Sequence, residues 1–214
     1  MNITWYGYSC LKLEESTRDS EAALVIDPFE ADGKIKLPRS LSADLVVSSL
    51  DDARSRAFAS VQNCKFFITG PGEYELKDIF VTGFTIDRAK APGKLSQGTI
   101  WSIVMGGIRV VNVAAATGPL SDKILEEISS TDILLVPVGG ELKAKAAHEI
   151  VDQIEPRMVI PINFKSGIIG ADLDGPELFI KLMGGGKPEV LPKFKLSPKD
   201  VPQEETKLII LEAQ

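Results

Sequence analysis

The stretch LVVSSLDDARS, residues 45–55, joins a short apolar run to a polar loop. The apolar run (45–47) consists of residues with high β preference, which predicts a buried strand. The polar residues that follow predict a turn, and the segment ARSRAFASV (53–61) then has a helical pattern. Loops that directly follow buried strands commonly carry functional groups in α/β proteins. The candidates in this loop are Ser49, Asp51, Asp52, Arg54 and Ser55, and no histidine stands among them.

Outward from this stretch, predicted strands come first in runs, and helices then alternate with strands. Strands are expected at 2–5, 10–13, 22–29, 44–49, 64–70, 78–86, 131–140, 157–164 and 207–213, with a hairpin over 99–115 that turns at Gly106 and Gly107. Helices are expected at 119–130, 143–154 and 175–186, where apolar residues recur at helical spacing or Gly and Pro mark the ends. The segment 187–206 contains four prolines and is predicted to be an irregular loop. This order favours two sheets packed face to face with helices outside.

The composition indicates one globular domain. The 214 residues suffice for a full-sized core, and we expect a single domain over 1–214, with its main part at about 1–165 and a C-terminal part at 166–214. No apolar run approaches the roughly 20 residues that span a bilayer, and the start of the sequence lacks the pattern of a signal peptide. With two cysteines and no CxxC pair, a cytoplasmic location is expected. The net charge of −6 argues against a nucleic-acid partner.

The histidine count limits the possible metal chemistry. The chain contains one histidine, His148, and so cannot build a zinc site from several imidazoles. His148 stands four residues before Asp152 on a predicted helix, which favours a surface pair over a Ser-His-Asp triad.

Several short motifs, in order, carry a resemblance to a known family. They are Gly7-Tyr8-Ser9-Cys10 after the first strand, Ile26-Asp27-Pro28, Ala43-Asp44 before the strand 45–49, Leu-Val-Pro-Val-Gly-Gly at 135–140, and Ile-Glu-Pro-Arg at 154–157. Together they resemble the short metallo-β-lactamase-fold hydrolases, in particular the branch similar to L-ascorbate-6-phosphate lactonase. The resemblance covers residues 1 to about 165. It implies an α+β fold, the αββα sandwich of two facing mixed sheets with outer helices.

The resemblance also implies where zinc ligands would stand, and this chain departs from the pattern there. The family's zinc loop reads Ser-His-x-His-x-Asp-His, its next motif His-Leu-Gly-Asp, and its last core strand ends in Pro-x-His-Tyr. Seven positions that would hold or bridge metal are changed here: Leu50, Asp52, Arg54, Ser55, Asn112, Ala115 and Asn163. Loss of all seven beside intact scaffold motifs suggests that the metal function has been discarded. We therefore expect no metal site, no cofactor and no catalytic residue of the zinc type.

The residues left at this place have two interpretations each. Asp51 and Asp52 are candidates for acid–base chemistry or a hard cation, but a solvated turn and helix N-cap is the simpler interpretation. Asn112 and Asn163 are candidates for ligand binding, or else polar remnants bonded to each other or to water in a filled pocket. Cys10 is expected to be a small core residue. With Tyr8 and Asp27, the changed positions define a predicted vestigial pocket.

Arg54 raises a further question because it stands at the family's aspartate position. A guanidinium is always charged and can bridge two carboxylates. One hypothesis therefore places Arg54 in part of the vacated metal volume, paired with Asp27 or Asp52. The alternative places it outward, as an ordinary surface residue of the helix.

The sequence thus predicts a pseudoenzyme, a metallo-β-lactamase-fold protein with a binding or structural role and an unknown ligand or protein partner. No nucleic acid and no membrane are expected as partners, and a homo-oligomer is possible. The alternative is a hydrolase of the same superfamily with a rebuilt site, without zinc or with oxygen ligands.

Overall fold

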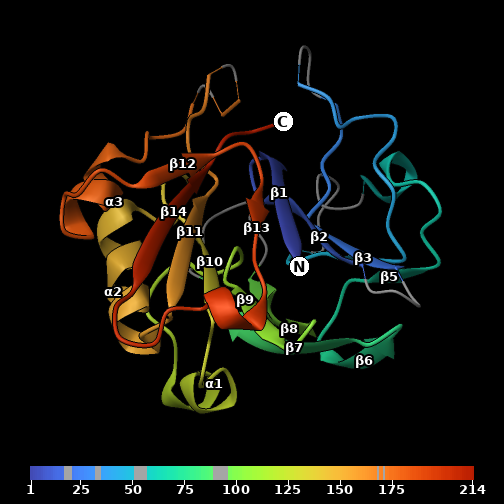
Figure 1. Ribbon diagram of the computed structural model, residues 1–214, viewed down its shortest axis with the longest axis horizontal. Coiled ribbons are helices and arrows are strands. Elements are labelled where there is room, and N and C mark those ends of the chain that lie inside the picture. Colours follow the sequence, from blue (N-terminus) through green and yellow to red (C-terminus); the bar gives the residue numbers. More distant parts are fainter. Residues whose placement is uncertain (17–20, 32–34, 51–56, 89–95, 168, 171) are drawn as a thin grey trace.

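Two mixed β-sheets face each other and form the body of the molecule (Figure 1). The computed structural model describes residues 1–214 apart from 17–20, 32–34, 51–56, 89–95, 168 and 171. A strand at the start of the chain pairs with a strand near its end, so segments from both ends belong to the same sheet (Figure 1). This arrangement confirms the predicted α+β sandwich.

The first sheet has six described strands. Their order is β13 (Phe194–Lys195), β1 (Asn2–Gly7), β2 (Cys10–Ser16), β3 (Glu21–Ile26), β4 (Leu45–Val47) and β5 (Phe66–Ile68). The pairs from β13 to β3 are antiparallel, and the pairs β3–β4 and β4–β5 are parallel. The β1–β2 hairpin closes at Gly7 and Tyr8, whose φ angles are 101° and 48°. The left-handed backbone at Gly7 suits glycine because it has no Cβ.

The second sheet has eight described strands. Their order is β12 (Glu189–Leu191), β14 (Lys207–Leu211), β11 (Met158–Ile162), β10 (Ile133–Pro137), β9 (Ile108–Asn112), β8 (Gln97–Met105), β7 (Ile79–Asp87) and β6 (Gly72–Leu76). The strands from β12 to β9 run parallel, and those from β9 to β6 pair as antiparallel hairpin neighbours. The central parallel strands β10 and β11 are apolar and buried on both faces, as expected for strands covered on both sides.

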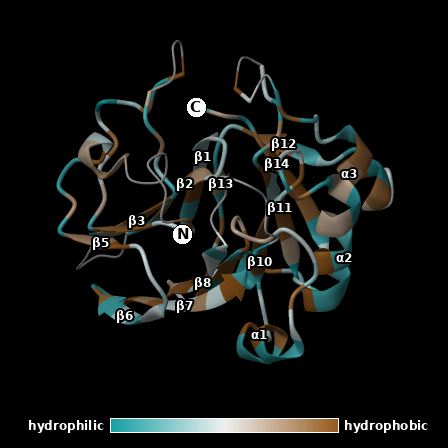
Figure 2. Cartoon of the chain, turned by 180° about the vertical axis from the view of Figure 1, so that it is seen from behind, coloured by the Kyte–Doolittle hydropathy of each residue, from teal (hydrophilic) through white to brown (hydrophobic). Residues whose placement is uncertain are grey.

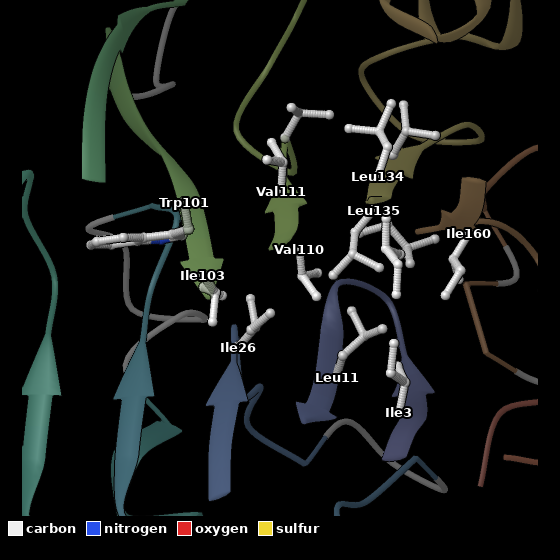
Figure 3. Packing of buried hydrophobic residues seen from close by; sticks show 14 of the residues in the cluster. Ile3, Leu11, Ile26, Trp101, Ile103, Val110, Val111, Leu134, Leu135 and Ile160 are labelled. Carbon is white, nitrogen blue, oxygen red and sulfur yellow. The ribbon is translucent and has the colours of Figure 1, made fainter. Parts of the chain in front are cut away.

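The main core lies between the two sheets (Figure 3). Ile3, Leu11 and Ile26 from the first sheet point toward Ile103, Val110 and Leu135 of the second (Figure 3). The side chains in this layer are almost fully buried, including both tryptophans. Burial of this much apolar surface is the largest favourable term in folding. Trp101 lies flat against the strand that carries Gly83, so the indole fills the space where a side chain at position 83 would be.

Helices cover one face of the eight-stranded sheet. The described α-helices are α1 (Asp122–Glu127), α2 (Ala144–Ile154) and α3 (Glu177–Leu182), and α2 packs against β10 and α3 (Figure 1). The α2 residues Ala147, Ile150 and Val151 face the core as the helical spacing predicted. Figure 2 shows mixed teal and brown on the helices and mostly brown on the central strands. Within the described residues, no helix is both long and apolar enough to cross a membrane.

The outer face of the six-stranded sheet has a different cover. A second apolar cluster joins Cys10, Val25 and Val46 of this face to Phe29 and Leu41 from the connections beside it. The only regular helical element described there is the short 3-10 helix η1 (Ala57–Ser60). Loop side chains therefore provide most of the outer layer that helices provide on the other sheet.

The C-terminal segment differs from its prediction. The region 187–206 was expected to be irregular, but it contains β12, β13 and the 3-10 helix η2 (Pro198–Asp200). The prolines fall outside the two strands or at the start of η2, and both strands lie at sheet edges. Proline is tolerated at such places, so its presence did not exclude short strands. The predicted hairpin over 99–115 is confirmed, with positive φ at Gly106 and Gly107.

The contact of Gly83 with Trp101 gives a test of the core packing. A Cβ at position 83 would lie 2.5 Å from Cζ3 of the buried Trp101, so Gly83→Ala should lower the free energy of unfolding by about 1–3 kcal/mol. Urea denaturation measures this change. Gly118→Ala is the control, because a Cβ there meets no atom within 4 Å, and it should change stability by no more than about 0.5 kcal/mol. Equal stability of the two variants would contradict the packing described here.

Candidate functional site

The carboxyl ends of strands from both sheets meet at one rim of the sandwich. Asp27 directly follows β3, Ser48 and Ser49 follow β4, Asn112 ends β9, and Asn163 follows β11. Backbone hydrogen bonds hold the connections in place, including Asp27 N to Val47 O at 2.9 Å and Thr99 N to Ser49 O at 2.8 Å. The second of these bonds joins the loop after β4 to the opposite sheet. The rim is thus a place where the chain itself brings polar groups together.

Asp27, Ser49 and Asn112 form a buried polar chain at this rim. The Asp27 carboxylate accepts a hydrogen bond from the Ser49 backbone N–H at 2.5 Å. The Asn112 amide donates to Ser49 Oγ at 2.9 Å, and its oxygen accepts from Ala114 N at 3.2 Å. Asp27, with 8% of its surface exposed and φ of 45°, is held in a left-handed conformation that short polar residues tolerate. Buried polar groups are stable only when they are hydrogen-bonded in this way.

Arg88 is the second buried polar group at the rim, and it follows β7. The guanidinium, on a residue only 9% exposed, donates from Nε to Ala115 O at 3.0 Å and from Nη2 to Glu141 Oε2 at 2.7 Å. The pair therefore joins three connections: the one after β7, the one after β9 and the one after β10. A buried cation needs such a partner because desolvation of an unpaired charge is very costly.

Apolar side chains fill the space beside Arg88. A Cβ built on Gly98 would lie 2.6 Å from Ala115 Cβ, 3.1 Å from Leu50 Cδ2 and 3.2 Å from Arg88 Cδ. These three side chains therefore meet at the glycine at the start of β8. Leu50 also packs against the main core. Apolar side chains and the aliphatic part of the Arg88 side chain therefore fill this part of the rim.

Tyr8 and Asn163 meet through their backbones. Asn163 N donates to Tyr8 O at 2.8 Å, and Trp5 Nε1 donates to the same oxygen at 2.9 Å. Tyr8 and Asn163 both have positive φ, 48° and 51°. The Tyr8 ring meets Phe29 edge-on, with 5.2 Å between the ring centroids. These contacts tie the turn of the β1–β2 hairpin to the connection after β11.

Asn163 also lies close to the Gly-Gly turn after β10. A Cβ on Gly140 would lie 2.6 Å from Asn163 Nδ2, so only glycine leaves room for the amide there. Asp174 N donates to Gly139 O at 2.9 Å on the other side of the turn. The Gly-Gly pair therefore serves close packing of backbone and amide.

The pKa of the Cys10 thiol is affected by its position next to the rim. Burial raises the pKa of Cys10 well above its usual value, and the neighbouring Asp27 charge adds to this shift. A thiol with a raised pKa stays protonated and is a poor nucleophile. Cys10 belongs to the outer apolar cluster, as its expected core role requires.

The structure brings together only part of the predicted vestigial pocket. Asp27 and Asn112 are linked through Ser49, Leu50 lies beside Ala115, and Tyr8 lies beside Asn163. Asp52, Arg54 and Ser55, with Asp51, lie outside the described residues, so the hypothesis that Arg54 enters the vacated volume stays a prediction. Asn112 is bonded to Ser49 and Ala114, which supports its interpretation as a satisfied polar remnant.

The sequence interpretation missed Arg88 and Glu141. Neither belongs to a motif, and a charged residue after a strand looks like ordinary surface. The only available indication was position: Glu141 directly follows the Gly-Gly turn, next to other rim residues. His148 is placed as predicted, with Nδ1 3.1 Å from Asp152 Oδ2 on the surface of α2.

A family model for the β-lactamase superfamily domain matches residues 2–163. The chain belongs to this superfamily. Sequence comparison with curated proteins found no match. The assignment to the lactonase-like branch stays a prediction, because the match is to the superfamily domain as a whole.

Solved structures share this fold over most or all of the chain. A proposed Zn-dependent hydrolase of the metallo-beta-lactamase superfamily from Thermotoga maritima is 25% identical, with a TM-score of 0.79, and the alignment covers 100% of this chain and 99% of the other. A proposed metal-dependent hydrolase from Parabacteroides distasonis is 13% identical, with a TM-score of 0.65 and coverage of 99% and 93%. An isothiocyanate hydrolase from Delia radicum gut bacteria is 9% identical, with a TM-score of 0.61 and coverage of 86% and 92%.

The zinc of the superfamily does not fit the described residues of the rim. Leu50 and Ala115 offer no side-chain donor, and the Asn112 amide is already bonded to Ser49 and Ala114. Arg88 adds a positive charge beside Ala115, which would repel a dication. Among the residues that the structure describes, no group of three or more His, Cys, Asp or Glu side chains is placed to hold a metal ion.

The Arg88–Glu141 pair predicts a measurable contribution to stability. Arg88→Ala should lower the free energy of unfolding by about 1–3 kcal/mol, because it removes the buried donor of the Ala115 carbonyl and the ion pair with the partly exposed Glu141. Lys143→Ala is the matched control: its ion pair with Asp174 is exposed on both sides, so its loss should cost no more than about 0.5 kcal/mol. Chemical denaturation compares the two variants, and similar small losses in both would show that the Arg88–Glu141 pair is unimportant for stability.

Proposed function

We propose that this chain is a member of the β-lactamase superfamily that works without metal and without hydrolysis, in a binding or structural role. The observation that carries the proposal is the mutual satisfaction of the rim groups. Asp27, Ser49 and Asn112 bond to one another, and Arg88 bonds to Ala115 and Glu141. The Ser49, Asn112 and Arg88 side chains are thus directed at protein partners instead of at a metal or a water molecule.

The chemistry of zinc hydrolysis supports the same proposal. Zinc in hydrolytic sites needs three protein ligands of the His, Cys, Asp or Glu type and an open position for water. It then lowers the pKa of the bound water enough to produce hydroxide near neutral pH. The chain has one histidine, and that histidine pairs with Asp152 on α2, away from the rim. The seven predicted ligand positions hold no histidine, and only Asp52 among them holds a carboxylate.

The alternative is a hydrolase of the same superfamily with a rebuilt site of oxygen ligands. Two observations favour keeping it as a candidate. The relative from Thermotoga maritima is described as a proposed Zn-dependent hydrolase, at 25% identity over the whole chain. In addition, Asp51 and Asp52 stand in the loop after β4 and offer carboxylates of the kind that Mg²⁺ or Mn²⁺ prefers.

The cellular setting that we propose is the cytoplasm, with a ligand or protein as partner. Two cysteines without a disulfide pattern suit a reducing compartment. The net charge of −6 disfavours a nucleic acid as the partner.

Metal content and turnover test the proposal together. Protein purified without a tag is expected to contain far less than one mole of zinc or manganese per mole of chain. It should show no saturable hydrolysis of phosphodiesters, lactones or β-lactams, with or without added Zn²⁺ or Mn²⁺. The reason is that the described residues of the rim include no group of His, Cys, Asp or Glu side chains placed to bind a metal ion.

The alternative, a hydrolase with a rebuilt site, predicts a different result. About one metal ion per chain, with saturable hydrolysis that disappears in Asp52→Ala, would establish the alternative hydrolase. Asp78→Ala is the control, because Asp78 is an exposed acid in the turn between β6 and β7 and should leave any activity unchanged.

A further inference from the structure

Two edge strands lie on the same side of the molecule and differ in character (Figure 1). β6, at the edge of the eight-stranded sheet, exposes Glu73 and Glu75. β5, at the edge of the six-stranded sheet, exposes Phe66 and Phe67, whose surfaces are 54% and 46% accessible. Figure 2 accordingly colours β5 brown and β6 in part teal. Charged residues are the usual protection of an edge strand against pairing, so β6 is protected and β5 is not.

The backbone of β5 is oriented for pairing with another strand. Ser48 N donates to Ile68 O at 2.9 Å, so the Ile68 carbonyl points toward β4. Backbone groups alternate in direction along a strand, which turns the N–H and C=O of Phe67 away from β4. In the described part of the chain, no strand lies on that outer side of β5. Phe67 therefore presents a donor and an acceptor at the open edge.

Apolar side chains flank this edge on both faces. Phe66 and Ile68 are in register with Leu45 and Val47, whose side chains belong to the main core. Phe67 points to the opposite face, where its ring centroid lies 4.6 Å from that of Phe58. The open edge of β5 is thus flanked by side chains of the main core on one face and by the Phe58–Phe67 ring pair on the other.

We propose that β5 pairs with β5 of a second copy of this chain, antiparallel, about a two-fold axis at Phe67. In this pairing Phe67 lies opposite its own counterpart, and Phe66 lies beside Ile68 of the second copy on the core side. The two six-stranded sheets become one continuous sheet. An isologous contact of this kind is the commonest way in which identical chains form a dimer. The inference is independent of the metal-free role proposed above.

Area and charge favour a second copy as the occupant. A phenylalanine offers roughly 200 Å² of surface, so Phe66 and Phe67 together contribute about 200 Å² of the roughly 800 Å² that each side of a stable interface buries. The exposed polar residues around them supply the remaining rim: Gln62, Asn63, Lys65 and Thr69. The antiparallel pairing about Phe67 places Lys65 of each copy opposite Thr69 of the other, so no like charges face each other along β5.

The acidic edge of β6 limits the contact. Glu73 and Glu75 of the two copies would repel each other if the eight-stranded sheets also approached. The interface is therefore confined to β5 and its flanks, and the dimer dissociates reversibly on dilution.

Sedimentation of the full chain from about 1 µM to about 1 mM tests this dimer over the affinity range of weak interfaces. The mass should rise with concentration from 23.2 kDa toward twice that value. Phe67→Glu should raise the dissociation constant at least tenfold, because it places two like charges at the axis. Val190→Glu is the matched control: Val190 is 52% exposed on β12, the edge strand at the far end of the other sheet, and the variant should dimerise like the wild type.

An engineered disulfide between the two copies tests the register of the proposed β5–β5 pairing. Opposed residues that exchange both backbone hydrogen bonds have Cα atoms about 5.5 Å apart, within reach of a disulfide. In a Cys64→Ser background, Phe67→Cys should therefore form a covalent dimer on mild oxidation and revert on reduction, whereas Val190→Cys should not.

Two results would overturn the proposal. One is the mass of a single chain at every concentration together with no cross-linking of Phe67→Cys. The other is a dimer that Val190→Glu disrupts and Phe67→Glu does not, which would place the contact at β12. Circular dichroism checks that each variant is folded. If Phe67→Glu does not fold, the cross-linking of Phe67→Cys alone decides whether β5 pairs with β5.

Discussion

The hydrogen bonds of Ser49 are the constraint on which the rim of this molecule depends. Ser49 belongs to the loop after β4 in the six-stranded sheet, yet its carbonyl accepts from Thr99 and its hydroxyl accepts from Asn112, both in the other sheet. Its backbone N–H is held by Asp27 in its own sheet. One residue thus fixes the two sheets relative to each other at the end where the connections converge. Because these groups are buried, each bond lost would leave a costly unsatisfied partner.

The same rim shows how protein side chains alone can tie converging loops together. A dication in a converging site neutralises acids and ties loops together. In this chain the guanidinium of Arg88 ties three loops, and Glu141 balances its charge. Leu50 and Ala115 add apolar contact beside the arginine stem. The rim is therefore held both by a paired charge and by apolar contact.

Much of the fold could be predicted from the sequence, because its evidence is local. The apolar runs at 45–47 and 131–140 and the Gly106–Gly107 turn carry their structure in short patterns. The strands β12 and β13 could not be predicted in this way. They are short, lie between prolines, and form because β14 and β1 offer edges to pair with, which is a tertiary effect.

The site was predictable only where a motif marked it. Asp27 belongs to a motif that resembles the family, Asn112 stands at a position where the family's motif is changed, and the structure links the two through Ser49. Arg88 and Glu141 are 53 residues apart, and no short pattern shows that such a pair will meet. Their contact follows from the order of strands β7 and β10 in the sheet, which only the folded chain reveals.

The response of stability to zinc is the most direct test of the claim that protein groups alone hold the rim. Urea unfolding of the same preparation would be measured with a chelator and with excess Zn²⁺. The account predicts equal free energies of unfolding to within about 0.5 kcal/mol, because the native chain has no site that binds zinc better than the unfolded chain. A native site would instead add about 4 kcal/mol at a zinc concentration a thousand times its dissociation constant, and a gain of that size would contradict the account.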